Sequence, residues 1–258
     1  MTAGTTLIRL AGVSFSYPGG QPVLRDLDFS LNSGDRVGII APNGSGKTTL
    51  FHLIMGLLKP LSGRIEIFGK AVRDENDFTE VRRRIGLLFQ DADDQLFSPT
   101  VLEDVAFGPL NLGKPKAEAI AIARRTLAFL GLDDFEDRIT FKLSGGEKRL
   151  VSLATVLAME PEVLLLDEPG NGLDVRTRAA LIEILRSLDL SYILISHELD
   201  FITATTDTVY TMQNGKIRTD QELSVHQHVH AHPIGSYPHE HCRPEDAHRA
   251  EPPLITEK

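Results

Sequence analysis

The pattern of apolar and polar residues over positions 7–40 predicts strands separated by tight turns. Residues 7–17 alternate loosely and stop at Pro18-Gly19-Gly20. Residues 23–31 form a second strand pattern that ends at Asn32-Ser33-Gly34. Residues 36–40 are short, β-branched and apolar, which is typical of a strand buried on both faces.

After Gly46 the apolar spacing becomes helical, and Pro60 cannot continue such a helix. Strand and helix patterns then alternate, which implies a parallel sheet with helices on its faces. Residues 208–218, with Asn214-Gly215 in the middle, predict a closing β-hairpin. The apolar face of this first helix comprises Leu50, Leu53, Ile54 and Leu57. Further strands are expected at 64–68, 85–89, 163–166 and 191–195. Further helices are expected within 100–131 (broken at 113–115), from Gly146 to before Pro161, and over 175–188.

The composition changes after about Asp220. Seven of the nine histidines lie between His226 and His248, among prolines and few large apolar residues. We therefore expect a domain over residues 1–220 and a flexible, histidine-rich tail over residues 221–258.

Length and charge narrow the possible functions. The chain has 258 residues, of which 41% are hydrophobic, enough for one substantial core. Its formal net charge is -9, and non-specific nucleic-acid binding usually needs a basic face, so we expect no nucleic-acid partner. The single cysteine, Cys242, permits no internal disulfide and suits a reducing compartment.

No apolar run approaches the roughly 18 to 20 residues that span a bilayer, and the first residues lack a secretion-signal pattern. We expect a cytosolic protein. If it serves a transporter, other chains must supply the membrane-spanning part.

Residues 41–48, which read Ala-Pro-Asn-Gly-Ser-Gly-Lys-Thr, follow a predicted buried strand and open a helix. Glycines in such a phosphate loop let backbone N–H groups surround anionic oxygens, and the helix directs its positive end at them. Lys47 can then reach the β- and γ-phosphates, and Thr48 can ligate Mg²⁺. Alanine stands at position 41 where the motif normally has glycine, and affinity would suffer if that turn needed a positive φ. The predicted nucleotide-binding residues here are Asn43, Gly44, Ser45, Gly46, Lys47, Thr48 and Thr49.

Asp167 and Glu168 end the apolar run of residues 163–166. Ligands bind at the carboxyl ends of strands in open α/β sheets, so Asp167 can hold Mg²⁺ there and Glu168 can act as general base for an attacking water. The alternative is a strand-end acidic pair that only caps a loop, which the phosphate loop earlier in the chain disfavours.

These segments, together with four others, resemble the motifs of ATP-binding-cassette (ABC) ATPases, in the same order along residues 7–218. Leu143-Ser144-Gly145-Gly146 is the most specific of them. The resemblance implies an α/β phosphate-loop NTPase fold, with an N-terminal antiparallel β subdomain, a parallel-sheet core and a helical signature subdomain at about residues 91–159. The matching motifs are Walker A at 41–48, the Q-loop at Gln90, the signature at 143–147, Walker B at 167–168, the D-loop at 172–174 and the switch histidine at His197.

The resemblance also implies individual roles. Tyr17 would stack on adenine; the alternative is an ordinary aromatic residue at a strand end. Gln90 would touch Mg²⁺ or the attacking water, and His197 would contact the γ-phosphate; a solvated loop glutamine and a surface histidine are the alternatives. Ser144 and Gly146, with Gly145 between them, would bind the γ-phosphate held by a second subunit. The family works as a head-to-tail dimer that traps two ATP molecules.

Residues 88–101 and 103–109 resemble energy-coupling-factor (ECF) importers, especially those for cobalt and nickel. In such ATPases this region helps form a groove for a helix of the transmembrane coupling subunit. Leu96, Phe97 and Val101 are candidate contacts, or else core residues. The implied protein is the ATPase subunit of a nickel or cobalt importer, bound peripherally at the cytoplasmic membrane face beside a coupling subunit, a substrate-binding membrane subunit and a second ATPase subunit. An ECF vitamin importer and a soluble non-transport ABC ATPase are the alternatives.

Four tail histidines, from His226 to His232, recur at every second position, which places their imidazoles on one side of an extended chain, and His239, His241 and Cys242 form a second cluster. Neutral imidazole suits Ni²⁺, Co²⁺, Cu²⁺ and Zn²⁺, so the tail is a candidate for weak, reversible metal binding. The alternative is a disordered polar tail without such a role. The candidate ligands are His226, His228, His230, His232, His239, His241 and Cys242.

Overall fold

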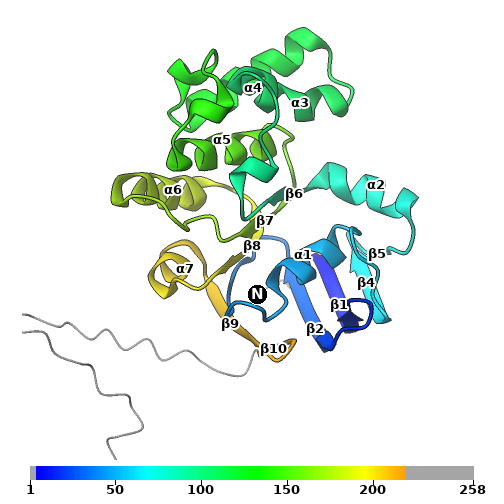
Figure 1. Ribbon diagram of the computed structural model, residues 1–258. Coiled ribbons are helices and arrows are strands. Elements are labelled where there is room, and N and C mark those ends of the chain that lie inside the picture. Colours follow the sequence, from blue (N-terminus) through cyan, green and yellow to red (C-terminus); the bar gives the residue numbers. More distant parts are fainter. Residues whose placement is uncertain (1–3, 219–258) are drawn as a thin grey trace, which may run out of the picture. The chain divides into compact units, whose positions relative to one another are not determined.

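The computed structural model describes residues 4–218 of the chain (Figure 1). The predicted tail over residues 221–258, with its histidines and Cys242, lies outside the described residues. Within residues 4–218 no helix is long and apolar enough to cross a membrane.

An antiparallel sheet forms one layer, with strand order β2-β1-β4-β5. Its apolar residues alternate with exposed ones, so that one face carries Leu24, Leu27, Phe29 and Leu31 into the core. The strands are β1 (Thr6–Ser16), β2 (Pro22–Asn32), β4 (Ser62–Ile67) and β5 (Lys70–Ala71).

The second sheet is mixed and has the order β10-β9-β3-β8-β7-β6. All its neighbouring strands are parallel except β9 and β10, which form the predicted hairpin. Ile40 pairs with Ser196, and Asp167 pairs with Ile195, so the carboxyl ends of β3, β7 and β8 meet at one edge. The strands are β3 (Arg36–Ile40), β6 (Ile85–Leu88), β7 (Val163–Asp167), β8 (Ser191–Ser196), β9 (Thr208–Gln213) and β10 (Lys216–Arg218).

Helices cover the mixed sheet, and α3, α4 and α5 pack on one another away from the antiparallel sheet (Figure 1). The residues of α3–α5 share a hydrophobic cluster with one face of the mixed sheet, whereas β1, β2, β4 and α1 cluster on the other. The helices are α1 (Lys47–Ile54), α2 (Glu75–Arg84), α3 (Val101–Asn111), α4 (Lys116–Phe129), α5 (Gly145–Leu157), α6 (Val175–Ser187) and α7 (Leu199–Thr205), with short 3₁₀ turns η1 (Ala92–Asp94), η2 (Asp133–Phe135) and η3 (Thr140–Lys142).

This architecture is the predicted α/β phosphate-loop fold, but two local expectations were wrong. Helix α1 ends before Leu57, which is 52% exposed. Gly56 has a φ of 68°, and the N–H groups of Leu57 and Gly56 bond back to the carbonyls of His52 and Leu53, so a left-handed glycine cap stops the helix. Val101, a candidate groove residue, is fully buried in the core instead.

Candidate functional site

The phosphate loop joins β3 to α1. Gly44 and Gly46 have φ values of 78° and 100°, a conformation that side chains disfavour, and Gly46 is the residue that precedes α1. Ala41 is fully buried and is not among the residues with positive φ, so alanine fits the first position of the loop without backbone strain.

Lys47 forms a buried ion pair across the loop. Its Nζ lies 2.5 Å from Oε1 of Glu168, and both side chains are almost fully buried. The same ammonium donates to Oδ1 of Asn43 at 3.3 Å. The other oxygen of Glu168, Oε2, lies 3.0 Å from Nδ1 of His197. Lys47, Glu168 and His197, which belong to different elements, therefore meet at the edge where the parallel strands end.

Asp167 and Thr48 lie beside this group. The hydroxyl of Thr48 donates to Oδ2 of Asp167 at 2.8 Å. The second oxygen, Oδ1, is buried and has no hydrogen-bond partner among the described residues. A buried carboxylate oxygen without a partner is costly unless a cation or a water binds it. Hydroxyl and carboxylate oxygens are also the ligands that Mg²⁺ prefers, so these residues fit a magnesium ion.

The two carboxyl groups differ in their electrostatics. Burial raises the pKa of Asp167, and this outweighs the opposing effects of Thr48 and Lys47. Burial also raises the pKa of Glu168, but the hydrogen bond and charge of Lys47 and the contact with His197 lower it further, so the net direction is down. Glu168 is consequently held as a carboxylate.

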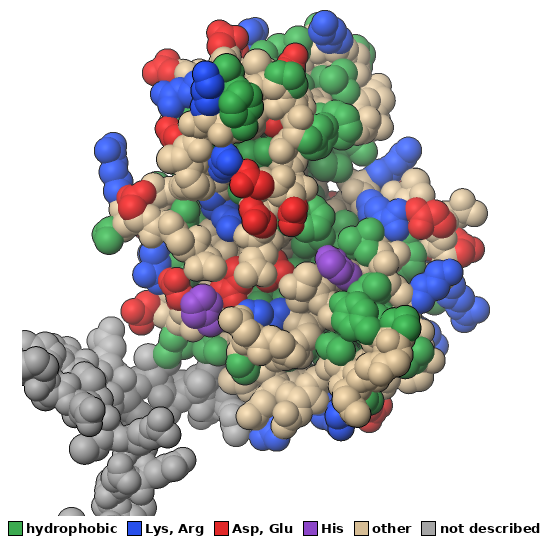
Figure 2. Space-filling view, viewed as in Figure 1, with side chains coloured by type: hydrophobic (Ala, Val, Ile, Leu, Met, Phe, Trp, Pro, Cys, Tyr) green, Lys and Arg blue, Asp and Glu red, His purple; other side chains and the backbone are tan. Residues whose placement is uncertain are grey.

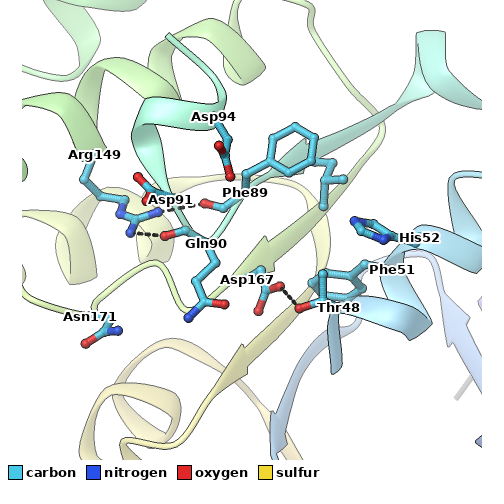
Figure 3. Close-up of a pocket in the computed structure, with 11 residues that line it drawn as sticks. Thr48, Phe51, His52, Phe89, Gln90, Asp91, Asp94, Arg149, Asp167 and Asn171 are labelled. Carbon is cyan, nitrogen blue, oxygen red and sulfur yellow. Dashed lines mark hydrogen bonds between the residues drawn. The ribbon is translucent and has the colours of Figure 1, made fainter. Parts of the chain in front are cut away.

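A cavity of about 780 Å³ opens beside Thr48 and Asp167 (Figure 3). The side chain of Gln90, which follows β6 after Phe89, extends toward Asp167. Sequence reasoning did not select several other lining residues, because nothing in their local pattern distinguishes them from solvated positions. These additional residues are His52, Asp91, Asp94, Arg149 and Asn171.

Figure 2 shows acidic side chains gathered near the middle of the displayed face, between the α3–α5 helices and the antiparallel sheet. Tyr17 is 46% exposed, with its ring edge-on to Phe15 and its hydroxyl 3.2 Å from Oγ1 of Thr49. Because Thr49 belongs to α1, this contact places an exposed aromatic ring beside the phosphate-loop helix.

The signature residues start α5 but do not line the cavity beside Thr48. Ser144 precedes the helix and accepts from the backbone N–H of Glu147, whose carboxylate accepts in turn from the N–H of Ser144 at 2.8 Å. A side chain added at Gly145 would meet open space. The helix N-terminus formed by Ser144, Gly145 and Gly146 can therefore receive an anion from outside this cavity.

Comparison with known families matches residues 24–171 to the ABC transporter family. A Nitratidesulfovibrio vulgaris protein, provisionally named an ABC transporter ATP-binding protein, is 49% identical over 241 residues, which are 93% of this chain and 88% of the relative. The energy-coupling factor transporter ATP-binding protein EcfA of Methanothermobacter thermautotrophicus is 41% identical, covering 82% of this chain and 69% of the relative. The cobalt import ATP-binding protein CbiO of Rhodobacter capsulatus is 42% identical, covering 83% and 78%.

Solved structures agree with this. The fold is similar to cbiO1 of Clostridium perfringens, described as part of the ABC transporter complex cbiONQ, with a TM-score of 0.76, 33% identity and coverage of 83% of this chain and 87% of that one. It is also similar to a dimeric bacterial ABC transporter cassette, with a TM-score of 0.74, 26% identity and coverage of 82% and 96%.

Proposed function

The chain belongs to the family of ABC transporter ATP-binding proteins, and on that premise we propose that it energises an ECF-type importer for nickel or cobalt ions. As a member of this family it is an ATPase whose turnover is coupled to transport. The observation that carries the catalytic part of the proposal is the meeting of Lys47, Asp167 and Glu168 at one strand edge.

In the proposed mechanism Lys47 exchanges partners. Its ammonium pairs with Glu168 at 2.5 Å. When ATP enters the phosphate loop, Lys47 turns to the β- and γ-phosphates and leaves Glu168 free to accept a proton from the attacking water. Thr48 and Asp167 would hold Mg²⁺, with Gln90 beside them, and the ion would supply positive charge to neutralise the phosphates. His197 keeps the Glu168 carboxylate oriented and reaches toward the γ-phosphate.

We further propose that two ATPase subunits close head to tail. Phosphoryl transfer needs positioning and charge stabilisation more than covalent chemistry. The N-terminus of α5, with Ser144, Gly145 and Gly146, supplies both for the γ-phosphate of the opposite subunit. The position of these residues outside their own subunit's cavity and the dimeric relative support this arrangement.

A second cavity, of about 380 Å³, supports the proposed contact with a transmembrane coupling subunit. Its lining is mostly apolar and includes Phe97 and Phe107, which are 65% and 43% exposed and pack edge to face. Asp104 also lines it, and one of its carboxylate oxygens has no hydrogen-bond partner among the described residues. A partner helix with apolar and basic side chains would fit this groove. Docking there would hold the chain peripherally at the cytoplasmic membrane face, next to the substrate-binding subunit.

The catalytic assignment is tested by Glu168→Gln. The variant keeps the shape of the side chain but cannot accept a proton, so we expect ATP binding to persist while turnover falls about 10²- to 10⁴-fold. ATP affinity is measured by equilibrium binding and turnover by phosphate release from the full chain. Near-normal turnover would show that another group is the base.

The cargo assignment rests on the cobalt import relative CbiO and on the histidine-rich tail. Relatives named EcfA, whose name specifies no substrate, are equally compatible with the alternative of an ECF vitamin importer. Uptake of radioactive Ni²⁺, Co²⁺ and vitamins by cells that express the whole transporter separates the two. Metal uptake that is lost with Lys47→Ala supports the proposal, and vitamin uptake alone overturns the metal assignment.

The tail is tested separately, by titrating Ni²⁺ or Co²⁺ into the full chain and into a chain that ends at residue 220. We expect only the full chain to bind these ions weakly and reversibly, through imidazoles such as those of His226 and His228. Equal metal uptake by both chains would remove the tail from the proposal. ATP turnover should be similar in both, since the described site residues all precede position 220.

A further inference from the structure

Arg149 is a buried cation in the signature helix α5 to which the mechanism above gives no role. Only 7% of its surface is exposed. Its Nη1 donates to the backbone carbonyl of Phe89 at 2.8 Å, and its Nη2 donates to that of Gln90 at 2.5 Å (Figure 3). A planar guanidinium that makes two charged hydrogen bonds fixes the orientation of the segment it holds.

Burying the charge of Arg149 has a desolvation cost that offsets much of what the side chain could add to the stability of the fold. Burial lowers the pKa of Arg149, while the charges of Asp91 and Asp167 oppose that shift. A buried charge often contributes no more stability than an apolar side chain of similar size. The geometry therefore points to a role in placing the two carbonyls.

The segment that Arg149 holds is the one from which the Gln90 side chain extends. Phe89 and Gln90 come directly after β6, where the chain leaves the sheet for η1. From there the Gln90 side chain extends toward Asp167. Two further contacts attach this segment to α5: Nε2 of Gln95 donates at 2.8 Å to the carbonyl of Ser152, and Lys148 pairs with Asp93 at 2.5 Å.

We propose that Arg149 is a positioning residue that makes Gln90 follow the signature helix. Because Ser144 caps the start of α5, a movement of that helix toward a second subunit's nucleotide would be passed through Arg149 to Gln90 in its own site. The inference rests on the proposed role of Gln90 beside Mg²⁺ and the attacking water.

The test is a double-mutant cycle between Arg149→Met and Gln90→Ala in the full chain. Misplacing a catalytic group by about an ångström costs up to about 10²-fold, so we expect Arg149→Met to lower kcat about 10- to 100-fold with an unchanged KM for ATP. In the Gln90→Ala background the same substitution should lower kcat less than about twofold, because the residue it positions is gone. Arg149→Lys, which keeps the charge and one donor, should recover part of kcat.

Lys148→Met is the matched comparison on the same helix. It removes a contact to the largely exposed Asp93 and leaves the Phe89 and Gln90 carbonyls held, so it should lower kcat far less than Arg149→Met. The melting temperature of every variant is measured, and Arg149→Lys replaces Arg149→Met in the cycle if the latter is unstable. Equal losses of kcat in both backgrounds, or no loss in either, would overturn the proposal. If Gln90→Ala itself has normal kcat, the positioning role of Arg149 is wrong. The assignment of Glu168 as the base is tested independently by Glu168→Gln.

Discussion

Asp167 and Glu168 are adjacent in the sequence, yet their carboxyl groups have pKa values that move in opposite directions. Burial dominates at Asp167, whereas Lys47 and His197 outweigh burial at Glu168. The difference arises because successive residues at the end of β7 meet different neighbours. It suits the roles proposed for them, since Mg²⁺ would place a cation beside the buried Asp167 carboxylate, and Glu168 remains an ionised base.

Replacing Asp167 by asparagine should stabilise the nucleotide-free chain and destroy its activity. A raised folded-state pKa favours folding below the unfolded value of about 3.9, and this contribution is lost as pH rises through the folded pKa. At neutral pH the ionised carboxylate thus opposes folding, and Asn removes that cost while keeping an acceptor for Thr48. We expect the melting temperature to rise by about 2–4 °C, as for about 1 kcal/mol in a domain of this size.

Calorimetry at pH 7.5 and near pH 3.5 checks this, because the difference should shrink when the Asp167 carboxyl is largely protonated in both the folded and the unfolded chain. The added stabilisation by Mg²⁺ and ATP should disappear, along with ATP turnover. Asp189→Asn, at an exposed position, serves as the control and should change neither quantity. A lower melting temperature for Asp167→Asn at pH 7.5 would contradict the expectation.

At the residue scale the sequence predicted the phosphate loop and the acidic pair, since each is a local pattern with its own spacing. It did not predict that Lys47 pairs with Glu168, because the two are far apart in the chain and meet only through the strand register. Arg149 was missed for the same reason, as a helical arginine normally points to solvent. Only packing of α5 against the segment after β6 buries it.

Among the elements, three helices begin at positions that a short local sequence pattern fixes. Asp74, Thr100 and Ser144 each precede a helix and form reciprocal capping bonds with the acidic residue three positions later. At α5 the cap and the proposed γ-phosphate contact use the same side chain, Ser144. The two roles can therefore be separated by substitution.

Ser144→Ala and Ser144→Asp should differ in stability but share a loss of activity. Alanine removes the cap at a cost of about 1 kcal/mol, whereas aspartate is a good capping residue and should hold the free energy of unfolding within about 0.5 kcal/mol of the parent. Both lose the hydroxyl, and aspartate also repels the γ-phosphate, so ATP turnover should fall in both. Denaturant unfolding and phosphate release measure these effects. Full turnover by Ser144→Asp would contradict the proposed γ-phosphate contact.

Element boundaries were predicted well for the short, β-branched strands of the sheet core and less well for some helices. The strand predicted at 36–40 coincides with β3, and that at 191–195 with most of β8. The end of α1 was misplaced because the apolar spacing continues to Leu57 although Gly56 already turns the chain. Helix α7 was not predicted: it is short and has no side-chain cap, so little in its sequence marks it.

For the whole molecule, the parallel register explains why distant motifs form one site. Pairing of β3 with β8 and of β8 with β7 brings the phosphate loop, the acidic pair and His197 to one edge. The sequence implied this arrangement through the order of motifs. The groove at Phe97 was expected only through the family resemblance, because the walls of both cavities beside α5 come from elements whose packing no local pattern specifies.

The groove lined by Phe97 and Phe107 yields a prediction at this scale. Both rings are exposed in the single chain, so an aspartate at position 97 should leave folding and basal ATP turnover unchanged. A buried aromatic anchor contributes about 2 kcal/mol or more to an interface, so Phe97→Asp should weaken binding to the transmembrane coupling subunit at least about 30-fold. Phe129→Asp, at a 51% exposed position on α4 outside the groove, is the matched control. Binding is measured with the purified coupling subunit in detergent. Equal affinities for Phe97→Asp and the parent chain would place the membrane partner on another face.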